Sequence, residues 1–234
     1  MRRWARILGT VLVIAGVLTL VWAVVVWQWQ DPFTALYTKW RQRQLTSQYE
    51  KRVKAYEVPV AKPSIAGEQK VIARLARTYR FDSKRGQAIG RIRVPRMGVN
   101  MILVNGTDHD TLKKGPGRDL RTFMPGENRL VYIAGHRTTY LAPFSHIDRL
   151  KAGDKVTLEV PYGTFVYSVT HHRIVKATDL SVLRSPRHEL LELQACHPRF
   201  FASHRYIAYA RLIRVEPRGA EPFNVHTLAQ ASGK

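Results

Sequence analysis

The chain has 234 residues, of which 38 are Lys or Arg and 17 are Asp or Glu, so its formal net charge is +21. A hydrophobic fraction of 45% excludes a disordered polymer, and a single cysteine excludes an internal disulfide framework and a cysteine-rich zinc ribbon. No His-Glu-x-x-His or Cys-x-x-Cys spacing occurs, so we predict no metal site and no cofactor.

Residues 7–29 contain no charged side chain. At about 1.5 Å per helical residue, this run is long enough to cross a hydrocarbon core of about 30 Å. Three tryptophans lie toward its far end, and three arginines precede it. We therefore expect residues 1–30 to be an uncleaved signal-anchor in the cell membrane, crossing it once, with a cytoplasmic N-terminus and an extracellular body. A cleaved signal peptide is the alternative.

Residues 31–86 carry 13 basic and 5 acidic side chains, and we expect a basic helical stalk and linker here. Apolar residues recur at three- to five-residue spacing over 33–57, which predicts a polar helix. Prolines and a glycine in 58–67 break it, and a second short helical pattern covers 71–79. The stalk either lies on anionic lipid headgroups or acts as a simple spacer, and the spacer is slightly favoured.

From residue 87 onward, short apolar runs alternate with Gly, Pro, Asn and Asp clusters at intervals of roughly ten residues. This spacing, without long helices between the runs, predicts a mainly β domain over 87–216, either a barrel or a sandwich. The final segment, 217–234, is expected to be a loose tail. The predicted strands are Ile89–Val94, Met101–Val104, Leu130–Ala134, Lys155–Val160, Thr164–His172, Leu190–Ala195 and Ile207–Arg214.

Three residues at the ends of predicted strands could carry chemistry. Cys196 follows one strand, and taken alone a cysteine there is more often a small buried hydrophobe than a nucleophile. A nucleophilic cysteine needs a partner that shares its proton and a group that stabilises the oxyanion. His136 closes another strand and could be the first, while Arg205 opens a third strand and could be the second.

The segments around these residues are more specific than the residues themselves. Segment 134–140 reads Ala-Gly-His-Arg-Thr-Thr-Tyr and resembles the histidine motif of sortases. Segment 196–200, Cys-His-Pro-Arg-Phe, with Arg205 nine residues after the cysteine, resembles the cysteine–arginine motif of the same family. The resemblance extends in family order over residues 87–216 and is best for class E sortases of high-GC Gram-positive bacteria.

This resemblance implies an eight-stranded sortase-type β-barrel preceded by the transmembrane helix and the helical stalk. It also implies a membrane-anchored cysteine transpeptidase that anchors surface proteins to the cell wall. Such an enzyme cleaves the Thr–Gly bond of a C-terminal sorting signal through a thioacyl intermediate and joins the protein to an amine. By the same resemblance, Cys196 is the nucleophile, His136 moves the proton, and Arg205 stabilises the oxyanion.

Two departures from the family pattern bear on substrate binding. Residues 192–196 read Glu-Leu-Gln-Ala-Cys instead of Thr-Leu-x-Thr-Cys, so Ala195 lacks the hydroxyl group of the family's threonine. Asp119 stands where class E sortases commonly carry a tyrosine linked to a Leu-Ala-x-Thr-Gly signal, so that signal and Leu-Pro-x-Thr-Gly both remain open. Thr138, Tyr140 and His197 are the other candidate substrate-binding residues.

Two other functions remain in competition. A Cys-His peptidase that only hydrolyses would share the acyl-enzyme and differ only in using water. A non-catalytic, membrane-tethered basic module would bind anionic wall polymer and would not need Cys196. The favoured hypothesis names secreted proteins with sorting signals, a cell-wall precursor or pilin amine, and the membrane as partners. Nucleic acid is not expected, because no nucleic-acid-binding motif is present.

Overall fold

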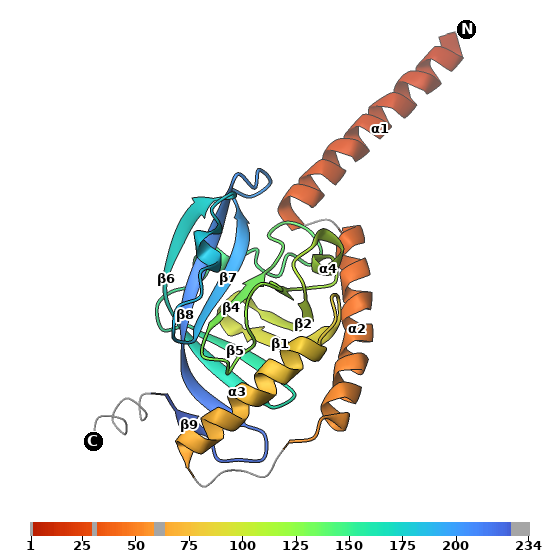
Figure 1. The fold of residues 1–234 in the computed structure, drawn as a ribbon. Coiled ribbons are helices and arrows are strands. Elements are labelled where there is room, and N and C mark those ends of the chain that lie inside the picture. Colours follow the sequence, from red (N-terminus) through yellow and green to blue (C-terminus); the bar gives the residue numbers. More distant parts are fainter. Residues whose placement is uncertain (1, 30–31, 59–63, 226–234) are drawn as a thin grey trace.

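The computed structural model describes residues 2–29, 32–58 and 64–225. Three long helices precede a β-rich body, and short helices lie in its loops (Figure 1). The helices are α1 (Arg2–Trp29), α2 (Pro32–Ala55), α3 (Ile65–Asp82) and α4 (His109–Leu112), with 3₁₀ turns η1 (Pro95–Met97), η2 (Ile147–Arg149) and η3 (Leu180–Leu183). The strands are β1 (Ala88–Val94), β2 (Val99–Asn105), β3 (Gly117–Arg118), β4 (Leu130–Ala134), β5 (Lys155–Val160), β6 (Gly163–Lys176), β7 (Leu190–His197), β8 (His204–Pro217) and β9 (Phe223–Asn224).

Strands β1 to β8 form a closed barrel. The hydrogen-bonded order runs β6-β5-β1-β2-β3-β4-β7-β8, and β8 pairs again with β6 to close the ring. Two neighbouring pairs are parallel, β2 with β3 and β4 with β7, and the others are antiparallel. The mainly β, eight-stranded barrel predicted from the motif resemblance is therefore confirmed.

All seven strands expected from hydrophobic spacing are present. The bounds of β4 and β5 are as predicted, whereas β6 and β8 are longer because they pair with each other along their whole length. Strand β3 has only two residues, too few for a periodic pattern. The segment expected to be a loose tail contains β9, which pairs with β8 and buries Phe223, so that expectation is wrong up to residue 225. Residues 226–234 lie outside the described ranges.

Alternate residues of β4 face opposite sides of the barrel wall. Val131 and Ile133 belong to the main core inside the barrel, together with side chains from β1, β5 and β6. Leu130, Tyr132 and Ala134 pack instead in a second apolar cluster with residues of β8 and η3. This period-two alternation gives β4 and its neighbour β7 an outer face covered by η3.

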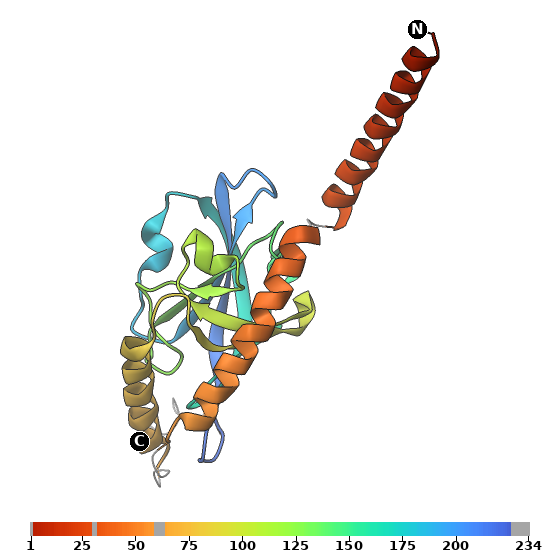
Figure 2. The ribbon, with the colours of Figure 1, turned by 90° about the vertical axis from the view of Figure 1, so that its right-hand side faces the viewer.

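Helix α2 is docked on the barrel, which Figures 1 and 2 show from two directions. Leu45 and Tyr49 pack against apolar residues of β1 and β2. Gln42 Nε2 donates to the carbonyl oxygens of Ile102 (3.1 Å) and Lys114 (2.7 Å), and its Oε1 accepts from Ile102 N (2.7 Å). The expectation of a simple spacer is therefore wrong for α2, because its contacts bind it to the edge of β2.

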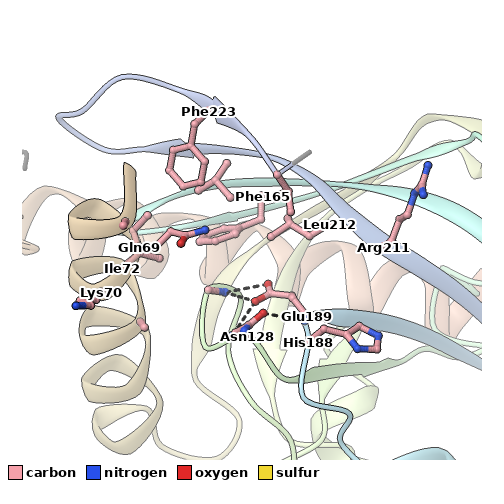
Figure 3. A pocket seen from close by; sticks show the side chains of 15 residues that line it. Gln69, Lys70, Ile72, Asn128, Phe165, His188, Glu189, Arg211, Leu212 and Phe223 are labelled. Atoms are coloured by element: carbon pink, nitrogen blue, oxygen red, sulfur yellow. Dashed lines mark hydrogen bonds between the residues drawn. The ribbon is translucent and has the colours of Figure 1, made fainter. Parts of the chain in front are cut away.

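Helix α3 starts at the Ser64 cap, whose hydroxyl group accepts from the backbone of Gly67, and covers the other side of the barrel. Between α3 and β8 lies a mainly apolar cavity of about 560 Å³ (Figure 3). Beside it, the buried Glu189 carboxylate accepts from the backbone of Gly126 and Asn128 and from the Tyr167 hydroxyl group (2.6 Å). These bonds tie the 126–128 turn to the start of β7, which gives Glu189 a structural role.

Within the described ranges, one helical stretch, Arg2–Val25, is long and apolar enough to cross a membrane. Its apolar side chains are exposed rather than packed on the barrel; Leu12, for example, is 63% exposed. Exposure of this kind is typical of a lipid-facing helix and unusual for a helix in water. The N-terminal helix expected from the apolar run is therefore present as α1, and it is long and apolar enough to cross a membrane.

Candidate active site

Two strands of the barrel carry the predicted nucleophile and the predicted oxyanion-stabilising residue. In the antiparallel β7–β8 pair, Cys196 lies directly opposite Arg205. Directly opposed residues have Cβ atoms about 5 Å apart and point to the same face of the sheet. Cys196 is half-buried, and its thiol forms no disulfide.

The predicted proton carrier reaches the same place through the parallel β4–β7 pair. Ala134 is paired with Gln194, and Gly135 N donates to Gln194 O at 3.0 Å, so the pairing continues just past the end of β4. His136 lies two residues after Ala134, and Cys196 lies two residues after Gln194. The parallel register therefore brings His136 and Cys196 to the same end of the barrel.

A cavity of about 250 Å³ lies on the outer face of β4 and β7. Cys196 and Arg205 line it together with residues of β4, β7 and η3. Its apolar lining continues the second cluster beneath the wall, because Tyr132, Ala134 and Val182 belong to both. The site is therefore a small groove whose lining combines apolar residues of the second cluster with polar residues, including Cys196 and Arg205.

His136 is not among the residues that line this cavity. Its Nε2 is buried and has no hydrogen-bond partner among the described residues, and the Tyr140 ring covers it at a centroid distance of 5.0 Å. Burial lowers the pKa of His136 below its ordinary value of 6.5, and the positive charges of His109 and Lys113 lower it further. The neutral imidazole is therefore the main form at neutral pH.

The Arg205 guanidinium is held in place by its own loop. Nη1 donates to the carbonyl oxygens of Ala202 (2.6 Å) and His204 (3.0 Å). These two bonds restrain the side chain beside Cys196. A guanidinium keeps its charge at any physiological pH, so it offers permanent hydrogen-bond donors to an anion formed at the thiol.

Arg137 joins the histidine loop to the cysteine strand, a role that the sequence alone does not reveal. Its side chain is 4% exposed and pairs with Asp148 at 3.0 Å. Nη1 donates to the carbonyl oxygen of Cys196 (3.2 Å) and lies 3.0 Å from His197 Nδ1. The only feature of the sequence that points to Arg137 is its position directly after His136. Its ion pair with Asp148 forms only because the fold brings the two residues together.

Asp119 and its neighbours form one wall of the groove. Its buried carboxylate receives hydrogen bonds from Arg121 Nη2 (2.8 Å) and from the Thr107 hydroxyl group (3.1 Å), and all three residues line the cavity. Burial alone would raise the pKa of Asp119, but these bonds hold it below its usual value. Asp119 is therefore an ionised group, already paired, at the predicted substrate site.

The other predicted substrate-binding residues lie in different surroundings. The Tyr140 ring contacts the His136 ring at an interplanar angle of 40°, and Thr138 is half-buried in the same loop. His197 contacts Arg137, and burial followed by the Arg137 charge lowers its pKa. Ala195 is fully buried in the main core, so the structure does not bring it to the groove. No cluster of three His, Cys, Asp or Glu residues in the described ranges could hold a metal ion.

Comparison with known proteins identifies relatives of this chain. A family model described as a sortase domain matches residues 92–213, which is more than half of the chain. Sortase D of Bacillus subtilis is 33% identical over 138 residues, covering 57% of this chain and 68% of that protein. Sortase SrtE1 of Streptomyces coelicolor is 26% identical over 149 residues, but the chain spans only 42% of its length.

Similar solved structures are also sortases. A sortase D5 transpeptidase from Clostridium perfringens has a TM-score of 0.60 at 25% identity, covering 74% of this chain and 98% of that one. Sortase E from Streptomyces avermitilis has a TM-score of 0.52 at 31% identity, covering 59% and 97%. Class E sortases are thus among the similar proteins, as the motifs predicted, together with relatives named sortase D. The chain belongs to the sortase family.

Proposed function

We propose that this chain is a membrane-anchored cysteine transpeptidase that joins proteins carrying a C-terminal sorting signal to an amine of a cell-wall precursor or a pilin. The observation that carries the proposal is the strand register, with Cys196 opposite Arg205 and His136 at the end of the adjacent strand. Membership in the sortase family supports it, because sortases are cysteine transpeptidases.

The proposed reaction has two steps. In the first, Cys196 Sγ attacks the threonine carbonyl carbon of the Thr–Gly bond. The carbon–sulfur bond forms, the carbon–nitrogen bond breaks, and the glycine amine leaves with a proton from the His136 imidazolium. In the second, the acceptor amine attacks the thioester, the carbon–sulfur bond breaks, and the proton lost by the amine passes to His136. The first step leaves an acylated Cys196 and a neutral His136, and the second step restores the Cys196 thiolate and the His136 imidazolium, so the two steps together return the enzyme to its starting state.

Arg205 has the role of stabilising the oxyanion that forms in each step. Its Nη1 is engaged with the carbonyl oxygens of Ala202 and His204, which leaves Nη2 and Nε to face the substrate carbonyl group. A donor fixed before the reaction needs no reorganisation when the charge develops, and losing one such donor typically costs about a hundredfold or more in rate.

The sorting signal occupies the groove in this proposal, and Asp119 lies in its lining. Thr138 and Tyr140 in the histidine loop, and His197 beside Arg137, would contact the part of the substrate that extends beyond the groove. Asp119 determines whether the enzyme prefers a Leu-Ala-x-Thr-Gly or a Leu-Pro-x-Thr-Gly signal in this proposal. Its paired carboxylate lines the cavity at the position where class E sortases commonly have a tyrosine ring. Comparing cleavage of both peptides by the wild type and by Asp119→Tyr tests this assignment. A substitution that leaves the ratio of the two rates unchanged contradicts it.

The membrane topology is also part of the proposal. Residues 1–30 are the anchor with a cytoplasmic N-terminus, and 31–86 connect it to the catalytic domain at 87–216, on which β9 packs. The long apolar stretch of α1 supports the anchor. An extracellular catalytic domain places the thiol on the side where secreted substrates and wall precursors are found. Protease protection of the body inside intact cells would overturn this orientation.

The test of the activity uses the full chain in detergent with a quenched sorting-signal peptide, with and without an amine acceptor. The expected result is cleavage that requires Cys196 and, with the acceptor, a product in which the amine is joined to the threonine, identified by mass spectrometry. Free acid alone in the presence of several amines would favour the hydrolytic peptidase. Equal turnover by Cys196→Ala would overturn the proposal and favour the non-catalytic binding module.

A further inference from the structure

Two neighbouring aromatic side chains are exposed at the tip of the β7–β8 loop. Phe200 is 63% exposed and Phe201 is 81% exposed. They lie four and five residues after Cys196, between the nucleophile and Arg205. Adjacent exposed phenylalanines on a soluble surface are unfavourable in water and commonly mark a contact with a membrane or another molecule.

The loop is a formed turn that holds these rings outward. The backbone N–H groups of Phe201 and Ala202 both donate to the carbonyl oxygen of Pro198, at 3.3 and 3.2 Å. Phe200 (φ 73°) and Ala202 (φ 52°) have left-handed backbone conformations, which non-glycine residues rarely adopt. Surrounding contacts maintain such a conformation. Here, the guanidinium of Arg205 binds the carbonyl oxygen of Ala202.

This loop lies at the end of the barrel where the anchor joins the body. At this end, the Tyr140 backbone N–H in the histidine loop donates to Thr34 Oγ1 in the first turn of α2 (3.0 Å). Thr34 is five residues after Trp29, the last residue of α1, so at most about 17 Å of chain separates them. Figures 1 and 2 both show the loop between β7 and β8 on the side of the barrel where α1 joins.

We propose that Phe200 and Phe201 insert into the interface of the lipid bilayer that α1 spans, giving the catalytic domain a second membrane contact beside its active site. This inference rests on the proposed membrane anchor. Aromatic rings are favoured at the headgroup level of a bilayer. The exposed Arg199 precedes the two rings, and the exposed Lys176 on β6 is paired with His204 of β8, so the loop carries positive charge for anionic lipid headgroups.

This contact would hold the groove at the membrane surface. Cys196 is separated from Phe200 by three residues, so a loop seated in the headgroup layer keeps the thiol within a short distance of the bilayer. With α1 as the first attachment and the loop as the second, the body could not rotate freely about its anchor. The groove would then meet substrates that are themselves held at the membrane.

The test uses the full chain, reconstituted into vesicles of phosphatidylglycerol and phosphatidylethanolamine. Cys196→Ala removes the only cysteine, and Phe201→Cys then accepts an environment-sensitive fluorophore at a single site. Matched labels at Leu12 in α1 (63% exposed) and Phe81 on α3 (68% exposed) serve as membrane and water references. Quenching by nitroxide-bearing lipid is compared with quenching by iodide in the water.

The expected result is several-fold stronger lipid quenching, relative to iodide quenching, at position 201 than at 81, with a blue-shifted emission. Water-like quenching at 201 with lipid quenching at 12 would overturn the loop contact and leave the anchor intact. Water-like quenching at both would overturn the anchor as well. A blue shift at 201 only when the sorting peptide is added would assign the loop to the substrate and overturn the proposal. A label at Phe200 repeats the test if Phe201→Cys does not fold.

Discussion

His136 combines a half-buried imidazole with cationic neighbours, and both features disfavour its protonated form. Burial comes first among the causes that lower its pKa, followed by His109 and Lys113. The proposed mechanism needs the imidazolium to protonate the leaving amine, so only a minor fraction of the enzyme is ready at neutral pH. Reaction rate should therefore follow the pKa of this single side chain.

We predict that Lys113→Gln raises the pKa of His136, because the substitution removes one of the positive charges that oppose protonation. Nuclear magnetic resonance titration of the His136 ring should give a midpoint below 6.5 in the wild type and a higher midpoint in the variant. The rate of peptide cleavage at neutral pH should increase with it. Lys151→Gln, an exposed lysine elsewhere on the body, is the control. An unchanged midpoint in Lys113→Gln would contradict this account of the site.

Glu192 is a buried carboxyl group that affects the pH dependence of stability, whereas His136 affects the reaction rate. It lies on the same face of β7 as Cys196, is 3% exposed, and has no partner for Oε2 among the described residues. Burial raises the pKa of Glu192 from 4.5 to about 8, opposed by the charge of Arg173. The folded state therefore keeps this proton while the unfolded state loses it above pH 4.5, and stability falls as pH rises toward about 8.

Glu192→Gln should remove this penalty. Each pKa unit corresponds to about 1.4 kcal/mol, so the variant should gain stability over the wild type progressively from pH 5 to pH 8. Thermal unfolding of both chains in detergent at several pH values measures the gain. Glu216→Gln, at an exposed ion pair with Arg214, should show no such trend. A difference between Glu192→Gln and the wild type that is the same at every pH would refute the assignment.

The residues of the site were predictable from sequence to unequal degrees. His136, Cys196 and Arg205 stand in short motifs whose order and spacing are specific, so their positions could be inferred before any strand was placed. Arg137 could not, because its partners Asp148 and His197 are distant in sequence and meet only after folding. Ala195 was expected near the substrate, but its place in the strand alternation turns it into the core.

At the scale of elements, short apolar runs bounded by turn residues predicted β4 and β5 with their observed ends. β4 is buried on both faces, in two apolar clusters, whereas β5 buries every second residue. The docking of α2 was not predictable in the same way. The apolar residues Leu45, Tyr49 and Val53 of this helix pack on β1 and β2, but their spacing in the sequence does not show which surface they meet. The attachment also uses the Gln42 amide, which bonds the backbone of Ile102 at the edge of β2, and a polar contact of this kind leaves no periodic pattern in the sequence.

A substitution of Gln42 tests whether the docking of α2 contributes to the stability of the body. Gln42→Ala removes an acceptor for Ile102 N and donors to two carbonyl oxygens, and leaves the partly buried amide of Ile102 unpaired. The expected cost is about 1–3 kcal/mol, seen as a lower unfolding temperature. Gln44→Ala, two residues along the same helix and bonded only to Arg41, is the matched control. Equal unfolding temperatures for the two variants would show that α2 contributes little.

At the scale of the whole molecule, the fold brings the strand ends of the site, the histidine loop and the end of α1 to one end of the barrel. The strand ends carry the thiol and guanidinium, the histidine loop contacts the first turn of α2, and α1 ends a few residues before that turn. The sequence predicted the barrel through family motifs and the anchor through its apolar run. It could not show that anchor and groove share an end, because that depends on where α2 docks. In the proposed function, this shared end would hold the groove close to the membrane.

The central claim is that Cys196, His136 and Arg205 form one acylating site. The most direct measurement is intact mass spectrometry of the full chain after brief exposure to a sorting-signal peptide, without an amine acceptor. The account predicts a thioester adduct on Cys196, no adduct in Cys196→Ala, and adduct formation slowed by about a hundredfold in Arg205→Ala. An adduct on Cys196→Ala, or wild-type acylation by Arg205→Ala, would contradict it.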